Sequence, residues 1–192
     1  MNHALRALGV LLVASLPTMV LATDQPPTGK ANDDFYGRHP ATIECVIEAA
    51  NKQDVPANIL LALASIESGK NGQLVTNKNG SIDISHFQIN SSNWNRGGAF
   101  ARYPAITKDA VQWRGCYNAE LAAWLLRTRL SEDTGKDFWT RAANYHSRTP
   151  KYNAEYRAKL IPLSIRWGKW LQQRVPHALV SYQPQVARST AP

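Results

Sequence analysis

The residues with the clearest chemical potential lie between Leu60 and Asn90, where one carboxyl group follows an apolar run and precedes neutral amides. Glu67 ends the apolar run, and Gln88 and Asn90 follow a loop rich in Asn, Gly and Ser. A protonated carboxyl can act as a general acid, and amides both donate and accept hydrogen bonds. The pattern therefore indicates acid catalysis on an uncharged, hydroxyl-rich polymer such as a sugar chain.

The spacing around Glu67 predicts that its carboxyl is held in the protonated form. Pro56 suits the first turn of a helix that includes this residue. Leu60 and Leu63 share a face of that helix with Glu67, so the carboxyl lies on a stripe that favours burial. Gly69 is a natural helix stop, which puts Glu67 in the last turn, where the helix dipole disfavours a carboxylate. Burial also raises a carboxyl pKa, so both effects favour the protonated form. A surface glutamate that only ends a helix is the alternative interpretation.

The elements that position this carboxyl follow from the apolar spacing, which predicts a mainly α domain over residues 40–175. Residues 70–83 predict a loop with a short β-turn or hairpin next to the site. Pro162 predicts a kink or a restart in the last helix. We expect helices at 40–51, 56–68, 91–94, 108–112, 119–130, 137–145 and 153–175.

The two ends of the chain differ from this domain. Residues 1–22 combine a positive charge at Arg6, an apolar core and a small-residue end, which is the pattern of a cleavable signal peptide. An uncleaved membrane anchor is the alternative, although the core is short for a span. The polar residues 23–39 predict a flexible lead-in, and residues 176–192 predict a disordered tail. After cleavage we expect no stable membrane span.

Cys45 and Cys116 are the only two cysteines, and export to an oxidising compartment allows them to form a disulfide. Two free buried thiols are the alternative. The five histidines show no His-x-x-x-His spacing. We therefore expect no metal and no other cofactor.

The formal net charge of +8 favours an anionic partner. Because the basic residues are scattered and a signal segment is predicted, we expect no nucleic-acid partner. An anionic cell wall, with peptide carboxylates on its glycan, fits an exported basic protein better. A basic surface that serves only solubility is the alternative.

Four blocks of residues carry a family resemblance, and they occur in a fixed order: Glu67-Ser68-Gly69, Asn77-x-Asn79-Gly80-Ser81-x-Asp83, Phe87-Gln88-Ile89-Asn90 with Trp94, and Tyr145-His146-Ser147-x-Thr149-Pro150-x-x-Asn153-x-x-Tyr156. Together they resemble the signature of lytic transglycosylases of the goose-lysozyme-like class. The small specialised enzymes of type III and type IV secretion, conjugation and pilus systems are the most similar subgroup. Cys45 and Cys116 fall where its members often carry a cysteine pair.

The resemblance implies a lysozyme-like single domain with one disulfide. It also implies a periplasmic enzyme that cleaves the bond between N-acetylmuramic acid and N-acetylglucosamine in peptidoglycan. Its product would carry a 1,6-anhydro ring, and its partners would be glycan strands and components of a secretion, conjugation or pilus machine. Glu67 would act as the acid and then as the base, with Tyr145 approaching its carboxyl. The expected substrate contacts are Ser68, Gln88, Asn90, Tyr145 and His146.

Asp83 leaves the reaction type open. In a turn-like setting it holds the loop through backbone donors, but as a second carboxylate it would make the protein a lysozyme-type hydrolase. A non-catalytic peptidoglycan-binding scaffold is a further alternative. The chain departs from the family at Ser85, where Gly is common, and at His146, where the broader class favours Asn.

Overall fold

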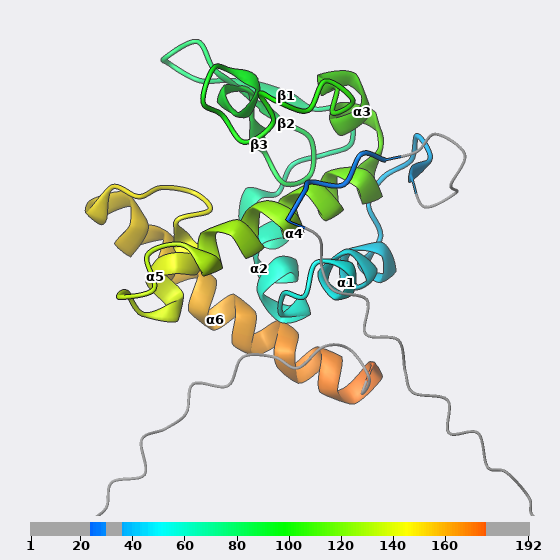
Figure 1. Ribbon diagram of the computed structural model, residues 1–192. Coiled ribbons are helices and arrows are strands. Elements are labelled where there is room, and N and C mark those ends of the chain that lie inside the picture. Colours follow the sequence, from blue (N-terminus) through cyan, green and yellow to red (C-terminus); the bar gives the residue numbers. More distant parts are fainter. Residues whose placement is uncertain (1–23, 30–35, 176–192) are drawn as a thin grey trace, which may run out of the picture.

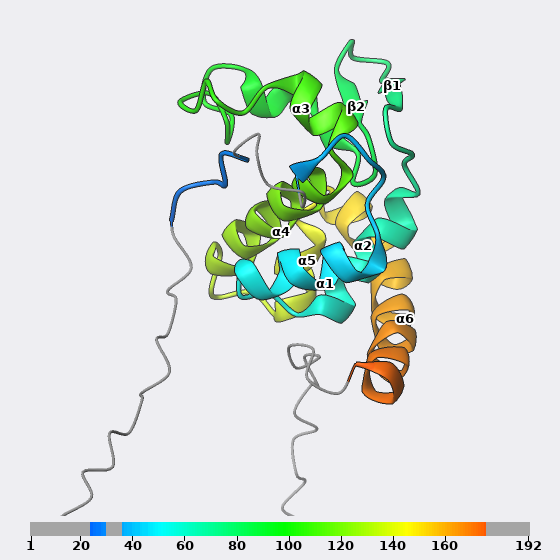
Figure 2. The ribbon, with the colours of Figure 1, turned by 90° about the vertical axis from the view of Figure 1, so that its right-hand side faces the viewer.

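The structure, a computed structural model, describes residues 24–29 and 36–175. Within these residues helices dominate, and one small sheet lies at the end opposite α6 (Figures 1 and 2). The predicted signal peptide and tail lie outside the described residues. In chain order the elements are α1 (Ile43–Lys52), α2 (Ala57–Glu67), β1 (Leu74–Thr76), β2 (Ile82–Ile84), β3 (Ile89–Asn90), the 3-10 helix η2 (Ser91–Trp94), α3 (Lys108–Trp113), α4 (Gly115–Ser131), α5 (Phe138–Ala143) and α6 (Pro150–Arg174).

Helix α2 is the centre of the core. All residues from Ala57 to Leu63 are buried, because the sequence is apolar around the whole circumference of the helix. The helix packs against α1, α4 and α6. This packing fixes the position of its carboxyl end, where Glu67 is the last helical residue.

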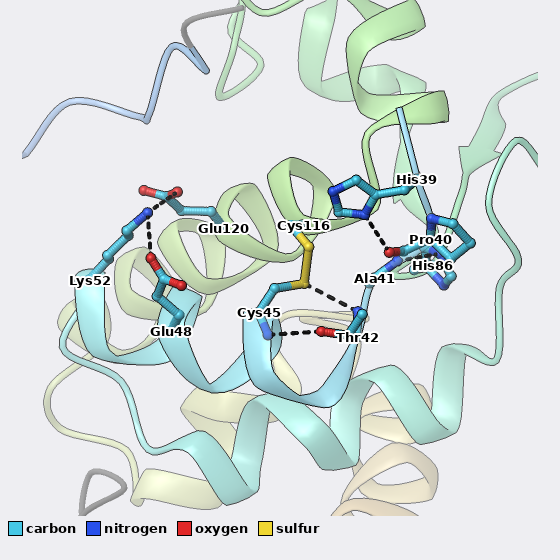
Figure 3. Close-up of a disulfide and its surroundings, with 10 residues drawn as sticks. All are labelled: His39, Pro40, Ala41, Thr42, Cys45, Glu48, Lys52, His86, Cys116 and Glu120. Atoms are coloured by element: carbon cyan, nitrogen blue, oxygen red, sulfur yellow. Dashed lines mark hydrogen bonds and ion pairs between the residues drawn. A yellow bond between two sulfur atoms is a disulfide. The ribbon is translucent and has the colours of Figure 1, made fainter. Parts of the chain in front are cut away.

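A disulfide between Cys45 and Cys116 joins α1 to the start of α4, with the two Cα atoms 5.5 Å apart (Figure 3). The predicted pairing is therefore confirmed. Helix α1 begins at a true cap, because the Thr42 hydroxyl accepts a hydrogen bond from the Cys45 backbone N–H at 3.2 Å. The disulfide closes a loop of 71 residues. A loop of that length corresponds to about 4 kcal/mol of stabilisation in the chain-entropy model.

The predicted hairpin is present and continues into a third strand. The order is β1-β2-β3, and both pairings are antiparallel. Leu74 pairs with Ile84 across β1 and β2, and Asp83 pairs with Asn90 across β2 and β3. Ile84, Phe87 and Ile89 are buried. These three side chains anchor the sheet to the helical core, close to the end of α2.

Helix α6 begins at Pro150, earlier than expected, and continues as one helix through Pro162. Proline suits the first helical position, since it has no N–H to leave unpaired. The predicted restart at Pro162 is wrong. An internal proline costs a helix about 3 kcal/mol. Here Leu160 and Ser164 are fully buried on either side of it, and the Asn58 side-chain amide donates to the Ser164 carbonyl at 3.1 Å. Tertiary packing outweighs the local penalty.

The described parts of the predicted lead-in are held against the domain. The Tyr117 hydroxyl donates to the Pro27 carbonyl at 2.9 Å, and Arg114 donates to the Gly29 carbonyl at 3.3 Å. The Tyr36 ring meets Tyr117 edge-on, with the ring centres 5.5 Å apart. Polar composition did not reveal these contacts, because each depends on helix α4. In the part of the chain that the structure describes, no helix combines the length and apolarity needed to cross a membrane.

Candidate active site

The carboxyl end of α2 is fixed by a tight contact with the turn between β2 and β3. Ser68 follows Glu67 in the left-handed conformation, with φ of 52°, and its hydroxyl donates back to the Ser65 carbonyl at 2.7 Å. Gly69 comes next, and a Cβ atom there would lie 1.9 Å from the Ser85 carbonyl oxygen. Only glycine permits this approach. Glu67 is therefore held where the helix meets the sheet.

The environment of Glu67 favours the protonated carboxyl. Burial raises its pKa from 4.5 to about 7, and the negative charge of Asp83 acts in the same direction. A hydrogen bond from Tyr156 and the positive charge of Lys159 oppose this shift without cancelling it. The side chain is half-buried. It thus combines a pKa near neutrality with access to solvent, which a general acid requires.

Tyr156 is the direct partner of the Glu67 carboxyl. Its hydroxyl donates to Glu67 Oε1 at 2.6 Å, and its side chain is buried. Burial and the charge of Glu67 raise the tyrosine pKa, so the phenol keeps its proton and acts as a donor. The bond leaves Oε2 as the carboxyl oxygen that carries the proton.

Tyr145, which the resemblance implies approaches the Glu67 carboxyl, does not make this hydrogen bond. The Tyr145 hydroxyl donates to the Phe87 carbonyl at 2.9 Å. Tyr145 still belongs to the site, because burial and then the charge of Glu67 raise its pKa. Tyr156 stands in the resemblance block, four residues before the buried Leu160. That spacing is the signal that could have indicated an inward-facing hydroxyl.

Asp83 is bound on both oxygens by neighbouring amides. Asn77 Nδ2 donates to Oδ2 at 2.9 Å, and Asn90 Nδ2 donates to Oδ1 at 2.7 Å. Asn90 has little capacity left, since its Nδ2 also donates to Ser81 and its Oδ1 accepts from the Ser92 N–H. Asn90, expected to contact substrate, thus connects strands and caps η2. Asp83 acts as the acceptor that ties β2, β3 and the hairpin turn together.

Gln88 and Ser85 form the turn that meets Gly69. Both have positive φ angles, 47° for Gln88 and 60° for Ser85. The Gln88 side-chain amide donates to the Ser85 carbonyl at 2.6 Å. Ser85 therefore adopts the conformation that glycine favours, as expected if the family glycine has a positive φ. A substrate contact by Gln88 stays a prediction, and so does one by Ser68, whose hydroxyl bonds the helix end.

His146 lies against the other side of Tyr156. The two rings are parallel within 6°, with their centres 4.7 Å apart. Partial burial lowers the pKa of the imidazole, and Lys159 adds to this effect while Asp83 opposes it. The residue is exposed. The lowered pKa favours the uncharged ring, and His146 forms an accessible wall beside the Tyr156–Glu67 pair.

The structure therefore brings Glu67, Asp83, Tyr145 and His146 into one site and adds Tyr156. Among the described residues, no group of three or more His, Cys, Asp or Glu side chains is placed to hold a metal ion. The sequence matches no protein-family model and no curated protein at a significant level.

Proposed function

We propose that the protein is a periplasmic lytic transglycosylase that cleaves the bond between N-acetylmuramic acid and N-acetylglucosamine in peptidoglycan. The observation that carries the proposal is the state of Glu67, a half-buried carboxyl with a pKa raised to about 7 and one oxygen held by Tyr156. The helical domain with a small sheet beside this carboxyl, together with the motif blocks, supports a lysozyme-like fold. No cofactor takes part in the proposed reaction.

In the first step, protonated Glu67 donates from Oε2 to the glycosidic oxygen while the bond to the anomeric carbon breaks. The hydroxyl on C6 of the same muramoyl ring then attacks that carbon, and its proton passes to the Glu67 carboxylate. The products are a strand with a free 4-hydroxyl and a strand that ends in 1,6-anhydro-muramic acid. Glu67 is protonated again at the end, so one carboxyl completes the cycle without water.

The bonding of Asp83 supports one catalytic carboxyl over two. A hydrolase of the usual type needs a second carboxylate that is free to act as nucleophile or to activate water. Both oxygens of Asp83 already accept hydrogen bonds from Asn77 and Asn90. Its negative charge nevertheless raises the pKa of Glu67. We therefore assign Asp83 to structure and electrostatics.

The proposed cellular role is local opening of the cell wall for a secretion, conjugation or pilus apparatus. It is supported by the predicted signal peptide and by the resemblance to the specialised enzymes of those systems. The disulfide between Cys45 and Cys116 fits a protein that folds outside the reducing cytoplasm.

Mass spectrometry of the muropeptides released from purified peptidoglycan tests the proposal. The wild type should release anhydro-muramoyl products, and Glu67→Gln should release none. Glu155→Gln is the control, because Glu155 is an exposed carboxyl on α6, the helix that carries Tyr156. It should behave as the wild type. Reducing-end products would contradict the transglycosylase reaction and return Asp83 to the catalytic step. Absence of products with intact wall binding would instead favour a scaffold.

A further inference from the structure

Helix α6 carries a strong positive charge over most of its length. From Tyr156 to Arg174 the helix contains five basic residues and no acidic one. Arg166, Lys169 and Arg174 are exposed. Across residues 24–29 and 36–175, neither Arg166 nor Lys169 forms an ion pair. This part of the helix therefore presents charge that the fold itself does not use.

One face of the same helix carries aromatic side chains. Leu163, Trp167, Trp170 and Arg174 follow one another at spacings of three and four residues, and we call them the α6 stripe. The two tryptophan rings meet edge-on with centres 5.5 Å apart, and the Arg174 guanidinium lies 5.2 Å from the centre of the Trp170 ring. Both tryptophans are half-buried. Leu163, Trp167 and Trp170 pack partly against the core, so the stripe lies at the edge of the packed face of α6 with part of each side chain accessible.

The α6 stripe continues the candidate active site. Tyr156, which binds the Glu67 carboxyl, precedes Leu163 by two helical turns on the same face. The path from Tyr156 to Arg174 spans roughly 27 Å at 1.5 Å per residue. Tyr156 itself is buried, but the exposed Lys159 precedes the exposed Arg166 by two helical turns. A polymer bound at Glu67 and running along these cations would meet the stripe. The charge of Lys159, which lies between the two regions, already acts on Glu67.

A pocket of about 200 Å³ opens beside the stripe. Its apolar lining comes from Ile43, Val46, Leu61, Ala64, Phe87 and Trp167. Its polar groups are already bonded. Ser65 Oγ accepts from Trp167 Nε1 at 2.9 Å, and His86 Nε2 accepts from the Ala41 N–H at 3.1 Å (Figure 3 shows this histidine near Ala41). Because few polar groups remain to be satisfied, the pocket suits small apolar groups such as methyls.

We propose that the α6 stripe, its flanking Arg166 and Lys169, and the adjoining pocket bind the acidic peptide stems attached to the glycan strand that is cleaved at Glu67. This inference rests on the proposed function. Peptide stems combine carboxylates with alanine methyl groups, which match the unpaired cations and the apolar pocket respectively. Continuity with Glu67 along α6 favours this ligand over a lipid surface. The protein would then prefer peptide-bearing strands to bare glycan.

Kinetics on two forms of one substrate test the inference. Glycan strands with their peptides, and the same strands stripped by an amidase, are cleaved by the wild type and by Arg166→Gln/Lys169→Gln. The double variant should reduce the preference for peptide-bearing strands, measured as the ratio of the two kcat/KM values, by about fivefold. Arg102→Gln/Lys136→Gln, which removes two exposed charges outside α6, should leave the ratio unchanged. An unchanged ratio in the α6 variant would overturn the inference.

Binding without catalysis separates this inference from the proposed function. Glu67→Gln protein is titrated with soluble disaccharide-tetrapeptide, and binding is followed by tryptophan fluorescence. We expect affinity that falls with added salt and that drops about fivefold further with Arg166→Gln/Lys169→Gln. If this binding is observed but the wild type cleaves no strand, the peptide site is supported and the transglycosylase proposal is overturned. No binding, or binding only to phosphatidylglycerol vesicles, would overturn the inference even if cleavage is observed.

Discussion

The sheet side and the helix side of the candidate site treat a carboxyl group in opposite ways. On the sheet side, Asp83 accepts hydrogen bonds from Asn77 and Asn90, one on each oxygen. On the helix side, Glu67 has a single described donor, Tyr156, and burial raises its pKa to about 7. Hydrogen bonds to a carboxylate stabilise its charged form, whereas desolvation favours the neutral form.

This difference explains how two nearby carboxyl groups can serve different purposes. The amides around Asp83 fix the strands, and the negative charge of Asp83 acts on Glu67. That charge helps to keep the proton on Glu67. The sheet side is therefore a rigid support with an electrostatic effect, and the helix side is the part that exchanges a proton with substrate.

The largest expected effect separates the two carboxyl groups by activity. Glu67→Gln removes the transferable proton, and we expect the rate of peptidoglycan solubilisation to fall between about 10² and 10⁴-fold. Asp83→Asn keeps Glu67, so the rate per folded molecule of this variant should fall by less than about tenfold. Turbidity assays on purified sacculi give both rates. Equal losses in the two variants would contradict the assignment of Asp83 to structure.

The stability of Glu67→Gln should exceed that of the wild type at high pH. The folded carboxyl has a pKa raised from 4.5 to about 7, so its charged form is disfavoured in the fold. The contribution of protonated Glu67 to wild-type stability is therefore complete below pH 4.5 and is lost as the pH rises from 4.5 through about 7. Glutamine removes the loss, which amounts to about 3 kcal/mol at most. Urea unfolding at pH 4 and pH 8 measures the difference in free energy of unfolding between the variant and the wild type. A stabilisation of the variant at pH 4 that equals the one at pH 8 would contradict the burial argument.

Asp83→Asn should act in the opposite direction. It replaces a charged acceptor of two amide hydrogen bonds by a neutral amide, which we expect to destabilise the fold by about 2 kcal/mol at neutral pH. Denaturant unfolding measures the change. Asp133→Asn, at an exposed aspartate outside the site, is the control and should have a smaller effect. A neutral Asp83→Asn would show that the amide network contributes little.

Tyr156→Phe tests the one hydrogen bond on the helix side. Because this bond lowers the pKa of Glu67, its removal should move the fall in activity to higher pH. The wild-type rate should decline as the pH rises through about 7, where the acid loses its proton. The shift should be on the order of one pH unit, which corresponds to about 1.4 kcal/mol. The pH dependence of kcat/KM measures it, with Tyr152→Phe on the exposed face of α6 as control. A shift to lower pH would contradict the assigned bond.

The smallest expected effect concerns the turn that supports both sides. Ser85 has a φ of 60° and is fully buried, and its hydroxyl contact to the Lys70 carbonyl is long at 3.5 Å. Ser85→Gly should relieve the backbone strain and stabilise the fold by less than about 1 kcal/mol. Thermal unfolding checks the change. A loss of several degrees would mean that the serine hydroxyl is a structural bond.

Local features of the site could be predicted from the sequence. The position of Glu67 at the end of an apolar helix could be predicted, because helical spacing and the glycine stop act within a few residues. The disulfide followed from the presence of a single cysteine pair. The partner of Glu67 could not be found in this way, since Tyr156 lies 89 residues away and reaches the carboxyl only when α6 packs on α2.

The remaining differences have the same physical origin. The role of Asn90 depends on the register that sets it opposite Asp83, and sequence alone does not fix that register. The continuity of α6 through Pro162 depends on burial of Leu160 and Ser164 against the core. Tertiary contacts override local propensity at each of these positions.

The central claim is that the fold holds Glu67 as an acid near neutral pH. Carboxyl-carbon NMR of the labelled protein measures this directly, with Glu67→Gln used to assign the resonance. We predict that the Glu67 signal titrates with a midpoint near 7, well above the ordinary value of 4.5. A midpoint at the ordinary glutamate value would mean that the carboxyl is ionised at neutral pH, and the proposed proton donor would be lost.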